Sequence, residues 1–189
     1  LAGRKRTAII QNAMDFVDNL ERAASLTREV GDLKSIGLVP TEIDLRNYFG
    51  KPDELIVSLS NFDLIWVRGG NAFVLRRAFR QSGADEIIQE LLAKDTVCYG
   101  GYSAGIDMLT PSLHGAELVD DPNIVPEGYE SPIIWDCLRI VPYAIAPHYK
   151  SDHPESAAVD KSVGYLIDNH IPFMALRDGE AIVRNGDKE

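Results

Sequence analysis

Residues 96–105 read TVCYGGYSAG, an apolar run followed by a pair of glycines and the pattern G-x-S-x-G. The apolar run predicts a buried strand, and the residues from Ala104 onward predict a helix. A serine between a strand and a helix in this pattern is typical of a sharp turn that lifts its hydroxyl above a sheet. The stretch therefore predicts an α/β fold with Ser103 as a candidate nucleophile at a strand end.

The same alternation of short apolar runs and amphipathic stretches continues on both sides of this segment. It predicts strands over residues 7–10, 38–45, 63–67, 96–99, 138–146, 172–176 and 181–184, and helices over residues 15–36, 52–60, 72–81, 85–93 and 155–169. This order predicts a doubly wound, mostly parallel sheet with helices on both faces, whose functional sites lie at the carboxyl ends of strands. Residues 110–135 lack a period and predict a long functional loop.

Length and charge narrow the classes of function. The 189 residues predict a single domain over 1–189, although the chain does not begin with Met and its N-terminus can be incomplete. The net charge of −10 argues against binding to nucleic acid or to an anionic membrane surface. Cys98 and Cys137 lie in apolar runs, and no run reaches the length of a membrane span. These features predict a cytoplasmic protein, in which an exposed edge strand would permit a homodimer.

A second feature at a strand end is Arg68-Gly69-Gly70-Asn71, which follows the apolar run DLIWV. Paired glycines let the backbone approach a ligand closely. The N–H of Gly70 or Asn71 can join that of Ala104, at the start of the next helix, in stabilising an oxyanion. A plain turn between a strand and a helix explains the glycines equally well.

A third feature is His148, which ends the predicted strand 138–146 and lies 45 positions after Ser103. A parallel sheet delivers both residues to one edge, so His148 is the candidate general base. Such a pair needs an acid that holds the imidazole in the correct tautomer. In the loop between them we favour Glu117, with Asp120 or Asp121 as the next candidates.

Other polar residues near strand ends are candidates for weaker roles. Asn71, Arg139, Lys150 and Arg177 are candidates for binding substrate, and Arg68, Arg76, Arg77 and Arg80 lie close together beside the glycine pair. His148 and His153 lack the helical spacing of a zinc motif, and Pro154 follows at once, so we expect neither a metal nor a cofactor.

The ordered set Gly69-Gly70-Asn71, Gly101–Gly105 and Pro147-His148-Tyr149 resembles the serine peptidases of family S51, which includes peptidase E and cyanophycinase. The resemblance spans residues 7–184 and implies a fold like that of the class I glutamine amidotransferases. It further implies Ser103 as nucleophile, His148 as base, Gly70 and Ala104 as oxyanion donors, and an acid near Glu117.

The leading hypothesis is a serine peptidase that acts on small peptides, including dipeptides with an N-terminal acidic residue. Such a preference predicts a basic mouth above Ser103, formed by the four arginines beside the glycine pair. An esterase or amidase with the same triad is one alternative. A catalytically silent binding module on the same scaffold is another, because a fold does not dictate a function.

Overall fold

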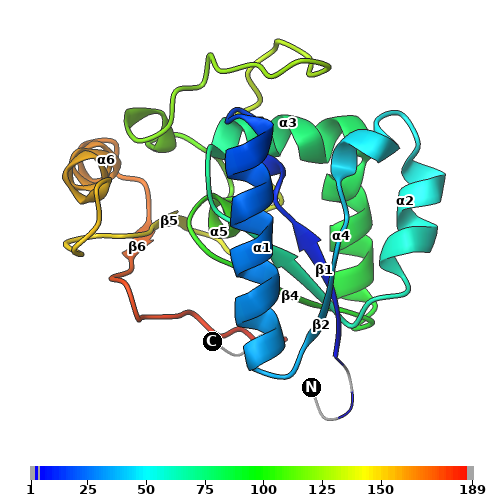
Figure 1. Cartoon of the computed structure of the whole chain (residues 1–189). Helices are drawn as coiled ribbons and strands as arrows, with labels where there is room; N and C mark the ends of the chain where they lie inside the picture. Colours follow the sequence, from blue (N-terminus) through cyan, green and yellow to red (C-terminus); the bar gives the residue numbers. More distant parts are fainter. Residues whose placement is uncertain (1–2, 4, 187–189) are drawn as a thin grey trace.

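Two parallel sheets organise the chain in the computed structural model, which describes residue 3 and residues 5–186 (Figure 1). The larger sheet has the order β2-β1-β3-β4 and consists of β1 (Arg6–Ile10), β2 (Val39–Glu42), β3 (Leu64–Val67) and β4 (Cys98–Gly101). The smaller sheet pairs β5 (Ala144–Ala146) with β6 (Phe173–Ala175). All of these strand pairs are parallel, as the alternation along the sequence predicted.

Helices cover both faces of the larger sheet. Its strands are connected by α1 (Asn19–Ser35), α2 (Pro52–Leu59), α3 (Ala72–Ser82) and α4 (Ala84–Ala93), whereas α5 (Ala104–Asp107) and α6 (Ser156–Asp168) follow later in the chain. Figure 1 shows α1 lying across the near side of the sheet, and α6 beside the β5–β6 pair at the left. Three short 3-10 helices complete the elements: η1 (Asn12–Met14), η2 (Leu45–Tyr48) and η3 (Ala116–Leu118).

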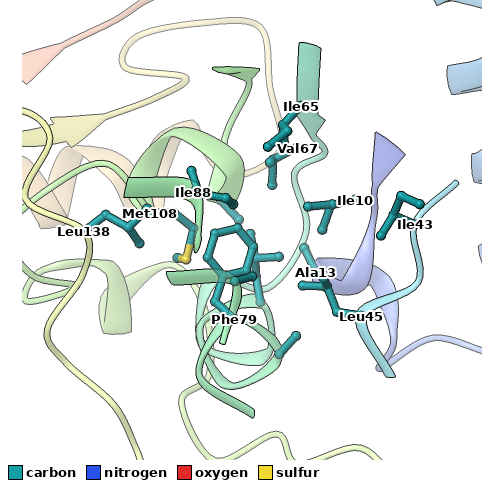
Figure 2. Close-up of a cluster of buried hydrophobic side chains, with 14 of the residues drawn as sticks. Ile10, Ala13, Ile43, Leu45, Ile65, Val67, Phe79, Ile88, Met108 and Leu138 are labelled. Atoms are coloured by element: carbon teal, nitrogen blue, oxygen red, sulfur yellow. The ribbon is translucent and has the colours of Figure 1, made fainter. Parts of the chain in front are cut away.

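The side chains of β3 face two different layers of helices, one on each side of the sheet. Ile65 and Val67 point into the apolar cluster formed with Phe79 of α3 and Ile88 of α4 (Figure 2). Because successive residues of a strand face opposite sides, Trp66 points the other way, toward α1. The sheet therefore has one strongly apolar face and one face with polar partners.

β1 lies between β2 and β3. The chain thus places β2 on one side of β1 and then returns to place β3 and β4 on the other side. Ligands of such sheets bind at this switch point, where the loops after the neighbouring strands separate. Here the two loops are joined, because the N–H of Asn71 donates to the Ala13 carbonyl at 2.9 Å and the N–H of Arg68 donates to Ile10 at 2.9 Å. The Gly69-Gly70 pair thus lies at the switch point.

The predicted fold class is confirmed, but two strand predictions are wrong. Only residues 144–146 of the predicted strand 138–146 pair in a sheet, because the N–H groups of Leu138 and Ile140 donate to the segment after α5 instead. Residues 181–184 form no strand, and β6 pairs with β5 rather than with them. The predicted helix 15–36 is shorter, since Asp18 caps its N-terminus and α1 begins at Asn19.

A helix that crosses a bilayer needs about 20 predominantly apolar residues. Within the described part of the chain, none of the helices is both long enough and apolar enough to cross a membrane.

Candidate active site

Ser103 lies in a strained turn between β4 and α5, with φ 50° and ψ −127°. Few residues other than glycine adopt this backbone conformation, and those that do cluster at functional sites. The turn lies tightly against β3, because a Cβ on Gly105 would lie 2.2 Å from the Val67 carbonyl oxygen and one on Gly101 would lie 2.6 Å from it. Both glycines of the G-x-S-x-G pattern are thus needed for the close approach that carries the serine.

The glycine pair after β3 lies directly beside this serine. A Cβ on Gly69 would lie 2.7 Å from the Ser103 Cβ and 3.2 Å from its Oγ. Gly70 has a φ of +139°, and a Cβ there would lie 2.5 Å from the Ala13 carbonyl oxygen. Only glycine fits these positions, so the loop can present backbone N–H groups at the hydroxyl, opposite the N-terminus of α5 at Ala104.

Asn71 has its polar groups committed within the fold. Its backbone N–H donates to Ala13, so of the two N–H groups that the sequence left open, that of Gly70 remains the candidate oxyanion donor. The Asn71 side chain is buried, accepts from the Val74 N–H at 2.9 Å and donates to the Asp121 carbonyl at 3.1 Å. The residue therefore caps α3 and anchors the long loop.

His148 follows β5 and pairs with an acid that the sequence reasoning missed. Its Nδ1 lies 2.6 Å from the Asp178 Oδ1, at the turn after β6. Its ring stacks on that of His153, with centroids 3.8 Å apart and an interplanar angle of 7°. Asp178 lies outside the interval between Ser103 and His148, in which the sequence predicts the acid. The rule that sites lie at strand ends would have pointed to Asp178, because β6 is parallel to β5.

The three acids favoured from the sequence have other partners. The Glu117 carboxylate accepts from the Gly115 N–H at 2.6 Å, and that of Asp120 accepts from the Ala72 N–H at 2.8 Å. The exposed Asp121 accepts from Asn123 at 2.9 Å. In this structure the His148 ring is therefore oriented by Asp178, and the loop acids stabilise the backbone of the loop and of α3.

Ser103 opens into a cavity of about 30 Å³ that also contacts the end of β5. This cavity reaches Pro147, the residue before His148, so Ser103 and His148 lie toward the same edge of the fold. Among the described residues no hydrogen bond joins the Ser103 hydroxyl to the His148 ring. Bonds between a nucleophile and its base are often long until substrate is bound.

The cavity is acidic. Its polar lining includes the carboxyl groups of Asp107, Asp120 and Glu155, and its described lining contains no lysine or arginine. Burial raises the pKa of Asp120 to about 7, with Glu155 adding to the effect, although the Ala72 N–H opposes it. Burial likewise raises the pKa of Asp107 well above its usual range, assisted by Asp120 and Glu155. Desolvated carboxyl groups that face one another favour a positively charged neighbour.

The four arginines do not form the basic mouth above Ser103 that the sequence predicts. Arg76 and Arg77 are buried, and their guanidinium groups donate to loop carbonyls, those of Asp136 for Arg76 and of Pro122 and Ser131 for Arg77. Arg80 lies half-exposed beside Asp85, and Arg68 lies beside Glu29. Buried guanidinium groups need hydrogen-bond partners, and the loop supplies them. Arg77 therefore holds the loop of residues 110–135 in place, and Arg76 holds Asp136, the residue that follows it.

The remaining candidates for substrate binding lie on the surface outside the lining of the cavity. Arg139 forms an exposed ion pair with Asp136 at 2.7 Å, and Lys150 lies over the Tyr149 ring. Arg177 is exposed beside Asp178. Lys150 and Arg177 are thus close in sequence to the His148–Asp178 pair, and Arg139 is committed elsewhere.

His148, His153 and Glu155 approach one another closely enough to raise the question of a metal. Their ligand atoms lie within 4.8 Å of one another. However, nitrogen lone pairs lie in the plane of the imidazole ring, and the two rings are nearly parallel and stacked. One ion cannot lie in both planes, and Asp178 already occupies the Nδ1 of His148. This arrangement suits a histidine held for proton transfer better than a metal ligand set.

Three comparisons with known proteins agree with the family resemblance that the sequence shows. The model of peptidase family S51 matches residues 20–189. Peptidase E of Streptomyces coelicolor is 30% identical over 156 residues, which cover 80% of this chain and 60% of that protein. A probable alpha-aspartyl dipeptidase of Drosophila melanogaster is 29% identical over 156 residues, covering 80% of this chain and 61% of that protein. The chain thus spans about 60% of the length of these two relatives.

A solved structure is similar over almost the whole chain. The crystal structure of a putative peptidase E protein from Listeria monocytogenes superposes with a TM-score of 0.75 at 25% sequence identity. The match covers 97% of this chain and 83% of that one. It agrees with the doubly wound fold, similar to that of the class I glutamine amidotransferases, that the sequence resemblance implied.

Proposed function

Because the chain belongs to peptidase family S51, we propose that it is a serine peptidase that hydrolyses dipeptides. In this proposal Ser103 is the nucleophile, His148 the general base and Asp178 the acid that orients it. The observation that carries the assignment is the 2.6 Å contact between the His148 Nδ1 and Asp178, at the same edge of the fold as the strained turn of Ser103. Ser103 and His148 keep the roles expected from the sequence, and Asp178 replaces Glu117.

The proposed chemistry follows from which ring nitrogen is free. Asp178 accepts a hydrogen bond from the Nδ1–H of His148, so the free Nε2 takes the proton of the Ser103 hydroxyl as its Oγ attacks the scissile carbonyl carbon. The negative charge on the carbonyl oxygen meets the N–H groups of Gly70 and Ala104. The imidazolium then protonates the leaving amine as the C–N bond breaks, which leaves an ester on Ser103. Water, deprotonated by His148, hydrolyses this ester and restores the serine.

The acidic cavity suggests how a dipeptide is chosen. In a dipeptide the α-ammonium group is attached to the carbon next to the scissile carbonyl, so it lies within a few ångströms of the attacking serine. Asp107, Asp120 and Glu155 offer carboxyl groups there. We propose that they recognise this ammonium, which would restrict the enzyme to peptides with a free N-terminus.

The side chain of the first residue is a separate question. The name of the Drosophila relative supports an N-terminal aspartyl residue. No cation among the described residues that line the cavity would pair with such a side chain, so an aspartyl carboxylate would have to bind near the exposed Lys150 or Arg177. A panel of dipeptides with Asp, Glu, Asn, Leu and Lys at the first position, compared by kcat/KM, decides between these possibilities.

Labelling by a fluorophosphonate tests the nucleophile itself. The wild type and Ser35→Ala, a control at an exposed serine of α1, should be labelled and should hydrolyse dipeptides, and Ser103→Ala should do neither. Unchanged hydrolysis by Ser103→Ala would overturn the proposal. Labelling without hydrolysis of any dipeptide would favour an esterase or amidase, and an unlabelled wild type would favour a silent binding module.

The location of the protein and its oligomeric state remain predictions from the sequence. The structure records Cys98 and Cys137 as free thiols, which is consistent with the proposed cytoplasmic location. A homodimer through an edge strand is a matter for a measurement of mass in solution.

A further inference from the structure

The inner face of α1 is unusual because it is mostly polar. A helix packed on a sheet normally buries an apolar stripe, but the buried residues of α1 are Arg22, Ser25, Glu29 and Leu33. A buried carboxylate is costly unless hydrogen-bond donors compensate for its lost hydration. The position of Glu29, over the face of the sheet that carries Trp66, therefore raises the question of what its carboxylate holds.

Three segments of the chain meet at Glu29. Its Oε1 accepts from the Trp66 indole N–H at 2.5 Å, and its Oε2 accepts from the Tyr102 hydroxyl at 2.8 Å. The Arg68 Nε lies 3.8 Å from the same Oε2, buried and without a hydrogen bond of its own. The partners of this one carboxylate thus come from β3, from the loop after β3 and from the turn after β4.

Two of these partners adjoin residues of the proposed active site. Tyr102 directly precedes the nucleophile Ser103, and Arg68 directly precedes the Gly69-Gly70 pair, to which its guanidinium is tied by a 2.7 Å bond to the Gly69 carbonyl. A serine in a strained conformation keeps it only where neighbouring contacts hold the backbone. The loop after β3 and the turn after β4 meet where Gly69 lies against Ser103.

We infer that Glu29 is a positioning residue, which fixes the Ser103 hydroxyl relative to the Gly70 N–H by binding Tyr102 and Arg68 at once. This inference rests on the proposed function, because it assigns Glu29 a role in the reaction of Ser103. Glu29 does not line the cavity into which Ser103 opens, and its hydrogen bonds go to Trp66 and Tyr102. Its effect is on geometry, and a misplacement of about 1 Å at a reacting group can cost about 100-fold in rate.

Tyr102→Phe is the sharpest test, because it removes one hydroxyl and keeps the ring that packs near Trp66. We expect kcat on a dipeptide to fall by about 10- to 100-fold with KM within about twofold, since alignment with the oxyanion donor acts in the transition state. The rate of fluorophosphonate labelling should fall in parallel. The matched control is Tyr48→Phe, which removes a 3.2 Å bond to Ser58 in another part of the fold and should leave both rates unchanged.

Two substitutions of Glu29 distinguish a positioning role in catalysis from a contribution to stability alone. Glu29→Gln keeps an oxygen acceptor and should retain more of kcat than Glu29→Ala, although both remove the charge. Melting temperatures of all variants are measured alongside. A partial rescue of kcat by Gln, at a similar melting temperature, supports positioning.

Two outcomes would overturn the inference. One is a Tyr102→Phe variant whose kcat and labelling rate equal those of the wild type. The other is a loss of activity in Tyr102→Phe and Glu29→Gln that is fully accounted for by the fraction of each variant that is unfolded. In either case the loss of labelling in Ser103→Ala would leave the proposed function standing, whereas an unlabelled wild type would reject both.

Discussion

His148 and Asp178 are 30 positions apart in sequence, yet the imidazole Nδ1 and the carboxylate Oδ1 lie 2.6 Å apart. The parallel pairing of β5 with β6 brings them together, because each residue follows the carboxyl end of its strand. The Glu117 carboxylate instead accepts from the Gly115 N–H at 2.6 Å. The geometry of the site thus depends on the smaller sheet as much as on the larger one.

Replacing the two candidate acids should give opposite results. Asp178→Asn should lower kcat by about 10²- to 10⁴-fold, because the amide no longer stabilises the imidazolium or the correct tautomer. Glu117→Gln should stay within about twofold of the wild type. Steady-state kinetics on one dipeptide compares them, and the reverse ranking would restore Glu117 as the acid.

Blocking the N-terminus of the substrate tests the role of the acidic cavity. N-acetylation of a dipeptide removes the positive charge that Asp107, Asp120 and Glu155 are proposed to bind, so hydrolysis of the acetylated form should be at least about 100-fold slower. Amidation of the C-terminus serves as the control, since it leaves the α-ammonium in place. Equal rates for the free and the acetylated dipeptide would contradict this recognition.

The buried carboxyl of Asp120 makes stability depend on pH. Its pKa is raised from 3.8 to about 7 in the folded state, so the folded protein holds a proton that the unfolded chain releases between those values. Stability therefore falls as pH rises from about 4 to about 7, by an amount on the order of 4 kcal/mol for this group. Asp120→Asn should remove this part of the loss, which melting temperatures at pH 5 and pH 8 will show. The opposite slope would be inconsistent with burial of an ionisable group.

Removal of the buried Arg77 side chain should be among the most destabilising substitutions in the protein. Arg77→Ala leaves the carbonyls of Pro122, Ile124 and Ser131 without their donor, so we expect a loss of about 2–4 kcal/mol in the free energy of unfolding. Arg80→Ala, at the half-exposed neighbour, should cost under about 1 kcal/mol. Urea unfolding measures both, and limited proteolysis should cut within residues 110–135 of the Arg77 variant first.

Two glycine substitutions separate a needed glycine from an incidental one. Gly105→Ala places a Cβ 2.2 Å from the Val67 carbonyl oxygen and should abolish labelling of Ser103. Gly164→Ala, in α6 with open space around it, should leave labelling unchanged and stabilise the protein by about 0.5–1 kcal/mol. Full labelling of the Gly105 variant would show that the turn can relax.

The parts that were predictable from the sequence share a local physical signal. The apolar run of β3 and the glycines around Ser103 each fix their own backbone, so strand, turn and helix could be placed from neighbouring residues alone. Chain order then brought Ser103 and His148 to one edge. The actual length of β5 was not predictable, because residues 138–141 are as apolar as a strand and bond to the segment after α5 instead.

The errors concern contacts between segments that are distant in sequence. Arg76 and Arg77 are charged residues on a helix, which normally indicates a solvated face, and only the folded loop shows that its carbonyls surround them. Glu29 gives no local signal at all, since its partners lie 37 and 73 positions away. Asp178, the acid proposed above, follows the histidine in the chain and so lies outside the interval in which the sequence predicts the acid.

The division of the strands into two separate sheets has a consequence for heat inactivation. Ser103 belongs to the four-stranded sheet, whereas His148 and Asp178 belong to the two-stranded one, and no backbone ladder connects the two within the described residues. Irregular backbone hydrogen bonds from residues 138–141 to the segment after α5, together with side-chain packing, keep the two units in alignment. Contacts outside the regular ladders open at a lower free energy than the core strands do. Turnover should consequently decline at temperatures where circular dichroism still reports a fully folded chain.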